Sequence, residues 1–205
     1  MGSARTHWDT VYKTKAETAV SWYQPHATRS LHLIKSSAPD QAASVIDVGG
    51  GTSTLIDGLL ACGFADVTVL DIAQSALDLA KSRVGRNAGK VSWIVADVTR
   101  WTPVRTWAIW HDRAVFHFLT ERSQQDEYLV ALKVATEPGA TAIISTFALD
   151  GPETCSGLPV QRYSPAVLAS RFGDAFVLTA QGHENHLTPR GSKQRFCYAV
   201  LKRMA

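Results

Sequence analysis

Short apolar runs rich in β-branched residues alternate along the chain with segments whose apolar residues recur every three or four positions. The runs at 44–49, 66–72, 90–98, 106–111 and 140–148 predict strands. Three segments with helical spacing lie between these strands, at 52–64, 73–85 and 123–136. Strands that alternate with helices in this way favour a parallel sheet with helices on both faces.

The pattern changes after residue 150. Ser164 at an N-cap and Pro165 at the first helical position predict a short helix over 163–172. The segments 174–184 and 193–203 then predict two strands, joined by a connection short enough for an antiparallel hairpin. We therefore expect a single Rossmann-like α/β domain with a mostly parallel seven-stranded sheet, a C-terminal antiparallel hairpin, and helices on both faces.

We expect three parts of this domain to have different roles. Residues 1–40 stand outside the alternation, contain a predicted helix at 27–37, and are expected to form a helical cap over the active site. Residues 41–150 form the predicted cofactor-binding core, and residues 151–205 supply a lid loop, the short helix and the hairpin. The cap also holds aromatic side chains, each of which alone is more often ordinary packing: Trp8, Tyr12, Trp22 and Tyr23.

The composition is sufficient for one hydrophobic core and argues against nucleic-acid and membrane partners. Of the 205 residues, 45% are hydrophobic and 19% charged, and the formal net charge is only +3. Because no block of like charges occurs, a nucleic-acid partner is not expected. No apolar stretch has the length of a membrane span, and the chain start lacks the apolar core of a signal peptide. We expect a cytoplasmic protein without a membrane partner, as a monomer or a dimer.

The cysteines and histidines give no clear metal or disulfide pattern. Three widely spaced cysteines lack a Cys-x-x-Cys motif, which argues against a disulfide framework and a thiolate zinc site: Cys62, Cys155 and Cys197. His183 and His186 lie near a predicted turn, where their spacing fixes no ligand geometry, so no metal site is expected even with Cys155 in reach. The start "MGSART" fits the loose myristoylation pattern at Gly2, but so short a pattern recurs by chance.

A glycine-rich turn, "DVGGGTS" at 47–53, connects the first predicted strand to its helix, where open parallel sheets commonly bind ligands. Glycine suits such a turn because it adopts positive φ and lets a ligand approach the backbone. A dinucleotide fingerprint G-x-G-x-x-G would start at Gly49, but its third position is Thr54, so the fingerprint is broken. Asp71, twenty positions after Gly51, suits a ribose diol in either cofactor class.

Two further acidic residues distinguish a dinucleotide cofactor from a sulfonium nucleoside. Asp47, just before the first glycine, would repel a pyrophosphate but can hold a cationic methionyl amino group through water or backbone groups. Asp97 closes the third predicted strand and is placed to accept a hydrogen bond from an adenine amino group. Acids at the ends of three successive strands therefore favour a sulfonium nucleoside over a ligand with two phosphates.

With these features the chain resembles the class I S-adenosylmethionine-dependent methyltransferases. The matching stretches are "VIDVGGGTS", "VTVLDIA", "VADV" and "EPGATAIIST", and the likeness covers about residues 40–150. The aromatic-Asp pair that often opens the family's fourth strand is Trp107-Ala108 here. The resemblance implies S-adenosylmethionine as cofactor, S-adenosylhomocysteine as product, and these cofactor-binding residues: Asp47, Gly49, Gly50, Gly51, Thr52, Asp71, Ile72, Asp97, Val98 and His111.

Candidate catalytic residues follow the fourth strand, in "IWHDRAVFHFL", which by analogy with the family faces the transferred methyl group. His111, Asp112 and Arg113 are polar groups after an apolar strand, which costs free energy unless they bond one another or a ligand. His111 is a candidate base or acceptor-orienting group, with a structural hydrogen bond as the alternative. Asp112 can pair with Arg113, orient His111 or touch the acceptor.

Candidate acceptor-binding residues come from three segments. Trp22 and Tyr23 lie in the cap, and Cys155 lies in the long, turn-rich lid loop at 147–164. His117 follows the fourth strand among Val115, Phe116 and Phe118, where a packed histidine competes with a substrate contact.

Four functions compete at this point. The first is methyl transfer to a small-molecule nucleophile, and the second is protein-lysine methylation, which predicts an open channel with acidic groups along it. The absence of an Asn-Pro-Pro-Tyr motif after the fourth strand counts against glutamine and adenine as acceptors. A nicotinamide-dependent oxidoreductase is disfavoured by Thr54 and by the hairpin ending, and a cofactor-binding protein without turnover stays open.

Overall fold

Five parallel strands and an antiparallel pair form one sheet in the computed structural model, which describes residues 3–205. The parallel strands are β1 (Val45–Val48), β2 (Val67–Asp71), β3 (Val91–Val95), β4 (Ile109–Arg113) and β5 (Thr141–Phe147). The antiparallel strands β8 (Phe176–Leu187) and β9 (Lys193–Arg203) extend the sheet in the order β3-β2-β1-β4-β5-β9-β8. The predicted fold class is confirmed, including the C-terminal hairpin.

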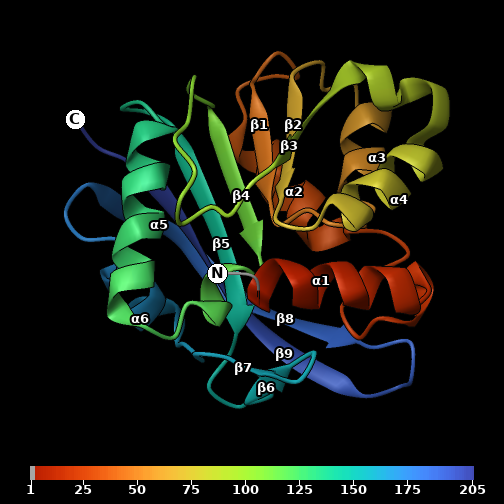
Figure 1. The fold of residues 1–205 in the computed structure, drawn as a ribbon. Helices are drawn as coiled ribbons and strands as arrows, with labels where there is room; N and C mark the ends of the chain where they lie inside the picture. The colour runs from red at the N-terminus through yellow and green to blue at the C-terminus, as the bar shows by residue number, and fades with distance from the viewer. Residues whose placement is uncertain (1–2) are drawn as a thin grey trace.

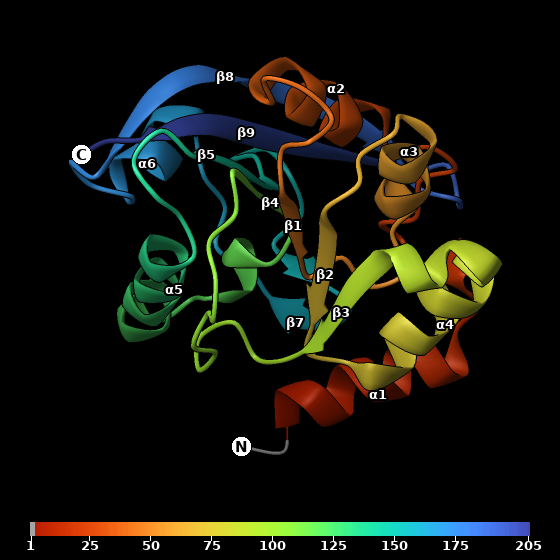
Figure 2. The ribbon, with the colours of Figure 1, turned by 90° about the horizontal axis from the view of Figure 1, so that it is seen from above.

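Helices cover both faces of the sheet (Figure 2). One face packs against α2 (Thr28–Ser37), α3 (Leu55–Ala61) and α4 (Gln74–Val84), and the other against α5 (Arg122–Val134) and α6 (Pro165–Ser170). Short 3₁₀ helices occur at η1 (Glu17–Ala19), η2 (Gly85–Lys90) and η3 (Phe116–Phe118). None of the helices in residues 3–205 combines the length and the apolar character that crossing a membrane requires.

Side chains of the central strands alternate between the two helical layers, as the two-residue period of a strand requires. In β1, Ile46 and Val48 join the core beneath α5, whereas Val45 joins the core beneath α2 and α3. All four residues of β1 are buried, which explains why the sequence shows a continuous apolar run there.

Strand β4 lies further along the chain than predicted. The sequence predicts a strand at 106–111, but β4 spans Ile109–Arg113 and pairs with β1 from Val45↔Ile109 to Val48↔Asp112. Trp107 lies before the strand, buried, with its indole N–H donating to the Thr68 hydroxyl at 3.0 Å. The consequence is that His111, Asp112 and Arg113 belong to the strand itself, so strand geometry decides where their side chains point.

The cap begins with a helix that the sequence pattern did not define. Helix α1 (Ser3–Thr14) lies across the carboxyl edge of the parallel strands, toward which the arrowhead of β4 points in Figure 1. Asp9 fixes it to α4 by accepting hydrogen bonds from the Ser75 N–H at 3.1 Å and the Ser75 hydroxyl at 2.7 Å. The predicted lid loop contains a further small ribbon, β6 (Thr154–Cys155) and β7 (Leu158–Pro159). Gly2, the candidate myristoylation site, lies outside the described residues.

Candidate active site

The glycine turn after β1 depends on glycine for two reasons. Gly49 and Gly51 have φ of +67° and +49°, a backbone conformation that only glycine adopts easily. A Cβ at Gly49 would lie 1.9 Å from Val115 Cγ2, and one at Gly51 would lie 2.6 Å from the Tyr12 hydroxyl oxygen. The turn is therefore enclosed between the segment after β4 and helix α1, and a side chain at either glycine would displace one of them.

Two cavities adjoin this turn. The larger, of about 300 Å³, is lined by five of the predicted cofactor residues: Gly49, Asp71, Ile72, Asp97 and Val98. A smaller cavity of about 50 Å³ is lined by Gly49 again and by four others: Asp47, Gly50, Thr52 and His111. Gly51 lies in the same turn but lines neither cavity. The structure thus brings the predicted cofactor residues together at the carboxyl ends of β1, β2 and β3.

Asp71 is the buried acid of the larger cavity. Its Oδ1 accepts a hydrogen bond from the Ala73 N–H at 2.8 Å. Burial raises the pKa of Asp71 to about 7, although the N–H groups of Ala73 and Gly51 favour the carboxylate. The negative charges of Asp47 and Asp9 raise this pKa further. Asp97 is less buried, and its Oδ1 accepts hydrogen bonds from the N–H and hydroxyl of Thr99.

His111 is paired with Asp47. The β1–β4 register sets these two residues side by side, and His111 Nδ1 lies 2.7 Å from Asp47 Oδ1 with both side chains buried. His111 lines the smaller cavity with the glycine turn and not the larger one. Its position therefore favours the cofactor side of the site over direct contact with an acceptor.

Asp112 points away from the other two catalytic candidates. Because it is one residue from His111 on a strand, its side chain enters the opposite helical layer, where it is fully buried. Its carboxylate accepts hydrogen bonds from the N–H groups of Val115 and Phe116 and from the Tyr128 hydroxyl, at 2.8, 3.1 and 2.7 Å. Contrary to its prediction as a catalytic residue, Asp112 pairs with neither Arg113 nor His111 and lines neither cavity. Asp112 holds the turn after β4 in place.

Arg113 returns to the face of the sheet that His111 occupies. It lines both cavities, and its guanidinium carbon lies 4.1 Å from the ring centroid of Phe196 on β9. Glu184 on β8 provides a nearby carboxylate, with Oε2 at 3.7 Å from Arg113 Nε. Burial lowers the pKa of Arg113 from its ordinary value, against the charge of Glu184.

The predicted acceptor-binding residues divide between the site and its surroundings. Trp22 and Cys155 line the larger cavity, and Tyr23 lines the smaller one. Burial raises the pKa of the Cys155 thiol to about 11, so the sulfur is protonated and poorly nucleophilic at neutral pH. His117 lines neither cavity. It is fully buried beside Phe147, whose N–H donates to its Nδ1 at 3.4 Å.

His117 is therefore a structural residue, contrary to its assignment as a substrate contact. Burial, together with the positive charge of Arg113, lowers its pKa to about 3, so the imidazole is neutral.

Several residues of the larger cavity were not assigned to the site from the sequence. Trp8 and Tyr12 lie one turn apart on the inner face of α1, a spacing that could have indicated a shared role. Trp8 stands edge-on to Trp22 and Phe118, with ring centroids 5.7 and 5.2 Å apart. The remaining walls come from distant strands and loops, for which no local signal exists: Phe147, Leu158, Pro159 and Phe196.

The histidines near the hairpin turn are separated. His183 and His186 both lie on β8, but three positions apart on a strand they point to opposite faces, and His183 is exposed whereas His186 is buried. His186 Nε2 lies 2.6 Å from the Ser21 carbonyl oxygen. Over residues 3–205, no three side chains of the His, Cys, Asp and Glu types gather closely enough to bind a metal ion.

A family model matches the core of the chain. Residues 45–139 match the family model described as a methyltransferase domain, and the matched segment runs from β1 to the turn before β5. By this match, residues 45–139 are a methyltransferase domain, with the class I fold that S-adenosylmethionine-dependent methyltransferases share. No curated protein sequence matches this chain significantly.

Solved structures share the fold of the methyltransferase along nearly its whole length. A S-adenosylmethionine-dependent methyltransferase from Anabaena variabilis superposes with a TM-score of 0.75 at 14% identity, covering 97% of this chain and 93% of that one. A structure described for the conversion of a disulfide bond into a thioacetal group during echinomycin biosynthesis gives 0.73 at 19% identity, covering 98% and 92%. The 1,6-didemethyltoxoflavin-N1-methyltransferase from Burkholderia thailandensis gives 0.70 at 15%, covering 99% and 85%.

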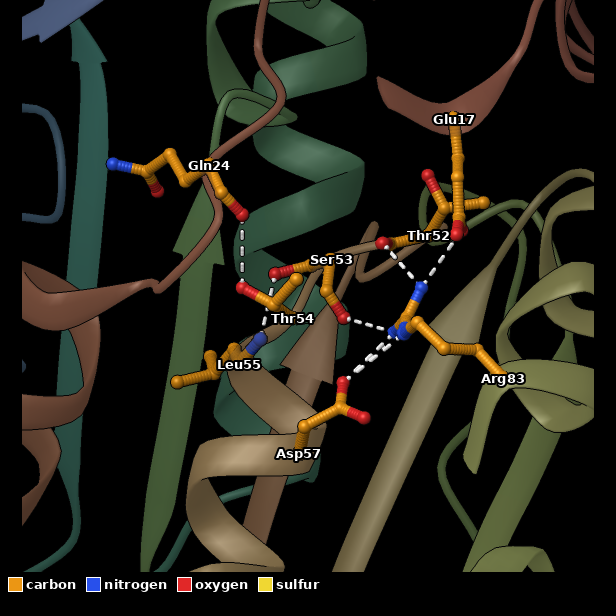
Figure 3. A network of polar contacts seen from close by, with 8 residues as sticks. All are labelled: Glu17, Gln24, Thr52, Ser53, Thr54, Leu55, Asp57 and Arg83. Carbon is orange, nitrogen blue, oxygen red and sulfur yellow. Dashed lines mark hydrogen bonds and ion pairs between the residues drawn. The ribbon is translucent and has the colours of Figure 1, made fainter. Parts of the chain in front are cut away.

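Arg83 ties the cap of the methyltransferase to its glycine turn (Figure 3). The guanidinium donates to the carbonyl oxygens of Thr52 and Ser53 at 2.9 and 2.8 Å, and pairs with Glu17 and Asp57 at 2.9 and 3.0 Å. One side chain from the end of α4 thereby joins η1, the turn and α3. The sequence offered no sign of this role, because nothing near Arg83 distinguishes it from a solvated helix residue.

Replacing Arg83 is expected to loosen the glycine turn. Arg83→Ala removes charge-assisted hydrogen bonds to two carbonyl groups, so we expect unfolding free energy to fall by about 1–3 kcal/mol and S-adenosylhomocysteine binding to weaken severalfold. Urea denaturation and calorimetric titration measure the two effects. Arg86→Ala, at an exposed position in η2, is the matched control and should change neither. Equal behaviour of the two variants would contradict the assignment.

Replacing His111 should act first on the cofactor. His111→Ala leaves the buried Asp47 carboxylate without its partner beside the glycine turn, so S-adenosylhomocysteine binding is expected to weaken by about tenfold. Calorimetric titration measures this, with the exposed His26→Ala as the control. A loss of turnover with unchanged S-adenosylhomocysteine affinity would instead place His111 with the acceptor.

Proposed function

We propose that this methyltransferase transfers the methyl group of S-adenosylmethionine to a small-molecule nucleophile. The observation that carries the proposal is the far end of the larger cavity, beyond the cofactor residues. Its walls come from the cap, from β5 and β9 and from the lid ribbon, and are mostly apolar: Trp22, Phe147, Cys155, Leu158, Pro159 and Phe196. The whole larger cavity, cofactor end included, has a volume of about 300 Å³. Apolar walls with few polar groups are the usual setting for a small ligand.

The residues of the site fit the cofactor. The tight glycine turn lets the cofactor approach the backbone, and the buried Asp71 can accept hydrogen bonds from the ribose. The adenine would lie beside Ile72, Asp97 and Val98, which line the same cavity. When bound, S-adenosylmethionine supplies a methyl group attached to a positively charged sulfur. Much of the catalysis then consists of holding the acceptor in line with that methyl group and excluding water.

No strong base faces the acceptor end of the cavity. Outside the cofactor end, the described lining residues that titrate are Tyr12, Arg113 and Cys155. None of them accepts a proton at neutral pH. Burial raises the pKa of the Tyr12 phenol well above its ordinary value, Arg113 is a guanidinium, and the Cys155 thiol has a pKa of about 11. We therefore propose that the accepting atom arrives with a free electron pair, and that the protein contributes position and desolvation.

The lining also favours a small molecule over a lysine side chain. Protein-lysine methylation predicts acidic groups along the entry, whereas the carboxylates that line the larger cavity, Asp71 and Asp97, belong to the cofactor end. The toxoflavin-type relative was solved with a small-molecule acceptor, 1,6-didemethyltoxoflavin, and S-adenosylhomocysteine bound. That relative supports the proposal by analogy of fold.

A radiolabelled-methyl assay tests the proposal. The enzyme is incubated with methyl-labelled S-adenosylmethionine and an extract divided by ultrafiltration into small-molecule and macromolecular fractions. We expect label in products formed from the small-molecule fraction and none on protein. Asp71→Ala enzyme serves as the negative control. Label on protein alone would overturn the proposal in favour of a protein acceptor.

A further inference from the structure

The side chain of Arg113 extends from β4 across β5 toward β9. Its register partner on β5 is Ser145, which in turn pairs with Tyr198 on β9, so these residues share one face. The guanidinium lies over Phe196 on β9, two strand spacings or roughly 10 Å from the line of β4. The glycine turn follows β1, on the opposite side of β4. The charged end of Arg113 is therefore on the acceptor side of the site.

The guanidinium also has unused hydrogen-bond donors. Within residues 3–205, Nε and Nη2 of Arg113 are buried and have no hydrogen-bond partner. Glu184 does not satisfy them, because its Oε2 lies 3.7 Å from Nε, and its Oε1 accepts a hydrogen bond from the Gln24 side chain at 2.8 Å. A buried donor without a partner costs free energy, so this pair of N–H groups is suited to a ligand.

We propose that Arg113 binds a carboxylate carried by the methyl acceptor, which is thus a small apolar acid. This inference rests on the proposed function and specifies its substrate class. The N–H groups at Nε and Nη2 lie on one edge of the planar guanidinium and match the two oxygens of a carboxylate. The apolar remainder of such an acid would contact Phe147, Leu158 and Phe196. The nucleophilic atom lies elsewhere on the acceptor, nearer the glycine turn.

A competing role for Arg113 is to bind the carboxylate of the cofactor's methionyl group, since Arg113 also lines the smaller cavity beside Gly49. The two roles give opposite results. If Arg113 binds the acceptor, replacing it leaves S-adenosylhomocysteine affinity unchanged. If it binds the cofactor, that affinity falls and acceptor-like acids bind poorly to the wild type.

The experiment titrates carboxylic acids into the full-length protein saturated with S-adenosylhomocysteine. The probes are benzoate, phenylacetate, indole-3-acetate and hexanoate, each paired with its neutral amide, and calorimetry measures binding. We expect at least one acid to bind at least tenfold more tightly than its amide. Arg113→Gln should remove that preference with unchanged S-adenosylhomocysteine affinity, and Arg113→Lys should retain part of it.

Two results would overturn the inference: no acid preferred over its amide, or a loss of S-adenosylhomocysteine affinity in Arg113→Gln. Should Arg113→Gln fail to fold, Glu184→Gln replaces it, because removing the competing carboxylate is expected to tighten binding of the preferred acid, and unchanged or weaker binding would contradict us. The radiolabelled-methyl assay tests the proposed function independently of this experiment. Methylated protein there would refute the small-molecule acceptor, whereas the acid–amide comparison reports on Arg113 itself.

Discussion

Asp71→Ala is expected to weaken S-adenosylmethionine binding by about 1–3 kcal/mol, or roughly 5- to 150-fold. If Asp71 binds the ribose as proposed, its two hydroxyls lose a buried charged acceptor, and the N–H of Ala73 loses its partner as well. Calorimetric titration of S-adenosylhomocysteine measures the change. Asp174→Ala, an exposed aspartate in the turn before β8, is the control and should bind as the wild type does. Unchanged affinity in Asp71→Ala would refute its assignment to the ribose.

The same residue should make cofactor binding depend on pH. The carboxylate of Asp71 accepts hydrogen bonds from the ribose only when ionised, and burial raises its pKa to about 7 in the free protein. Affinity is therefore expected to fall as pH drops below 7, by up to about tenfold per pH unit, and to level off above it. Asp71→Asn should flatten this profile. A wild-type affinity that is constant between pH 5.5 and 8.5 would contradict the coupling.

Folding stability shows the opposite trend with pH. Because the folded pKa of Asp71 lies above its ordinary value of 3.8, its contribution to stability is fully present below pH 3.8 and is lost as pH rises through about 7. Protein without cofactor is thus destabilised by Asp71 at the pH where the cofactor binds best. Such a cost is common where a group is positioned for a ligand.

The sequence predicted the sheet and the cofactor end of the site because both follow local rules. Apolar runs gave the strands, and the acids Asp47, Asp71 and Asp97 stand where the parallel strands must end. The acceptor end could not be predicted in this way. Phe147 and Phe196 come from strands almost fifty residues apart, and only the β5–β9 pairing makes them neighbours.

The polar residues of β4 explain why the end of this strand is predicted incorrectly from the sequence. The sequence predicts a strand that ends at residue 111, which places His111, Asp112 and Arg113 together after the strand. The strand continues to Arg113, so alternation sends His111 and Arg113 to one face and Asp112 to the other. The strand was not recognised because a buried strand is identified by its apolar residues. Here His111 and Asp112 are buried with hydrogen-bond partners, and Arg113 packs against the ring of Phe196.

Asp112→Ala is expected to destabilise the fold more than any other substitution considered for this chain, by about 3–5 kcal/mol. The carboxylate is fully buried and is the acceptor for two backbone N–H groups and the Tyr128 hydroxyl, which itself accepts from the Trp110 indole at 2.8 Å. Removing it leaves three buried donors without a partner and opens a cavity beneath α5. Urea denaturation measures the loss. Since small domains have only about 5–15 kcal/mol of stability, poor expression is expected at 37 °C.

Two companion variants separate this structural role from catalysis. Asp112→Asn keeps an acceptor oxygen and should lose less stability than Asp112→Ala. Burial raises the pKa of Asp112 to about 6, so the part of its stabilising contribution that is linked to protonation is fully present below pH 3.8 and is lost as pH rises through 6, whereas its hydrogen bonds to Val115, Phe116 and Tyr128 remain. Wild-type stability should therefore decline relative to Asp112→Asn between pH 4 and 6.5. If Asp112→Asn instead keeps its stability and pH profile but loses turnover, Asp112 acts in the reaction and the turn after β4 is held by other contacts.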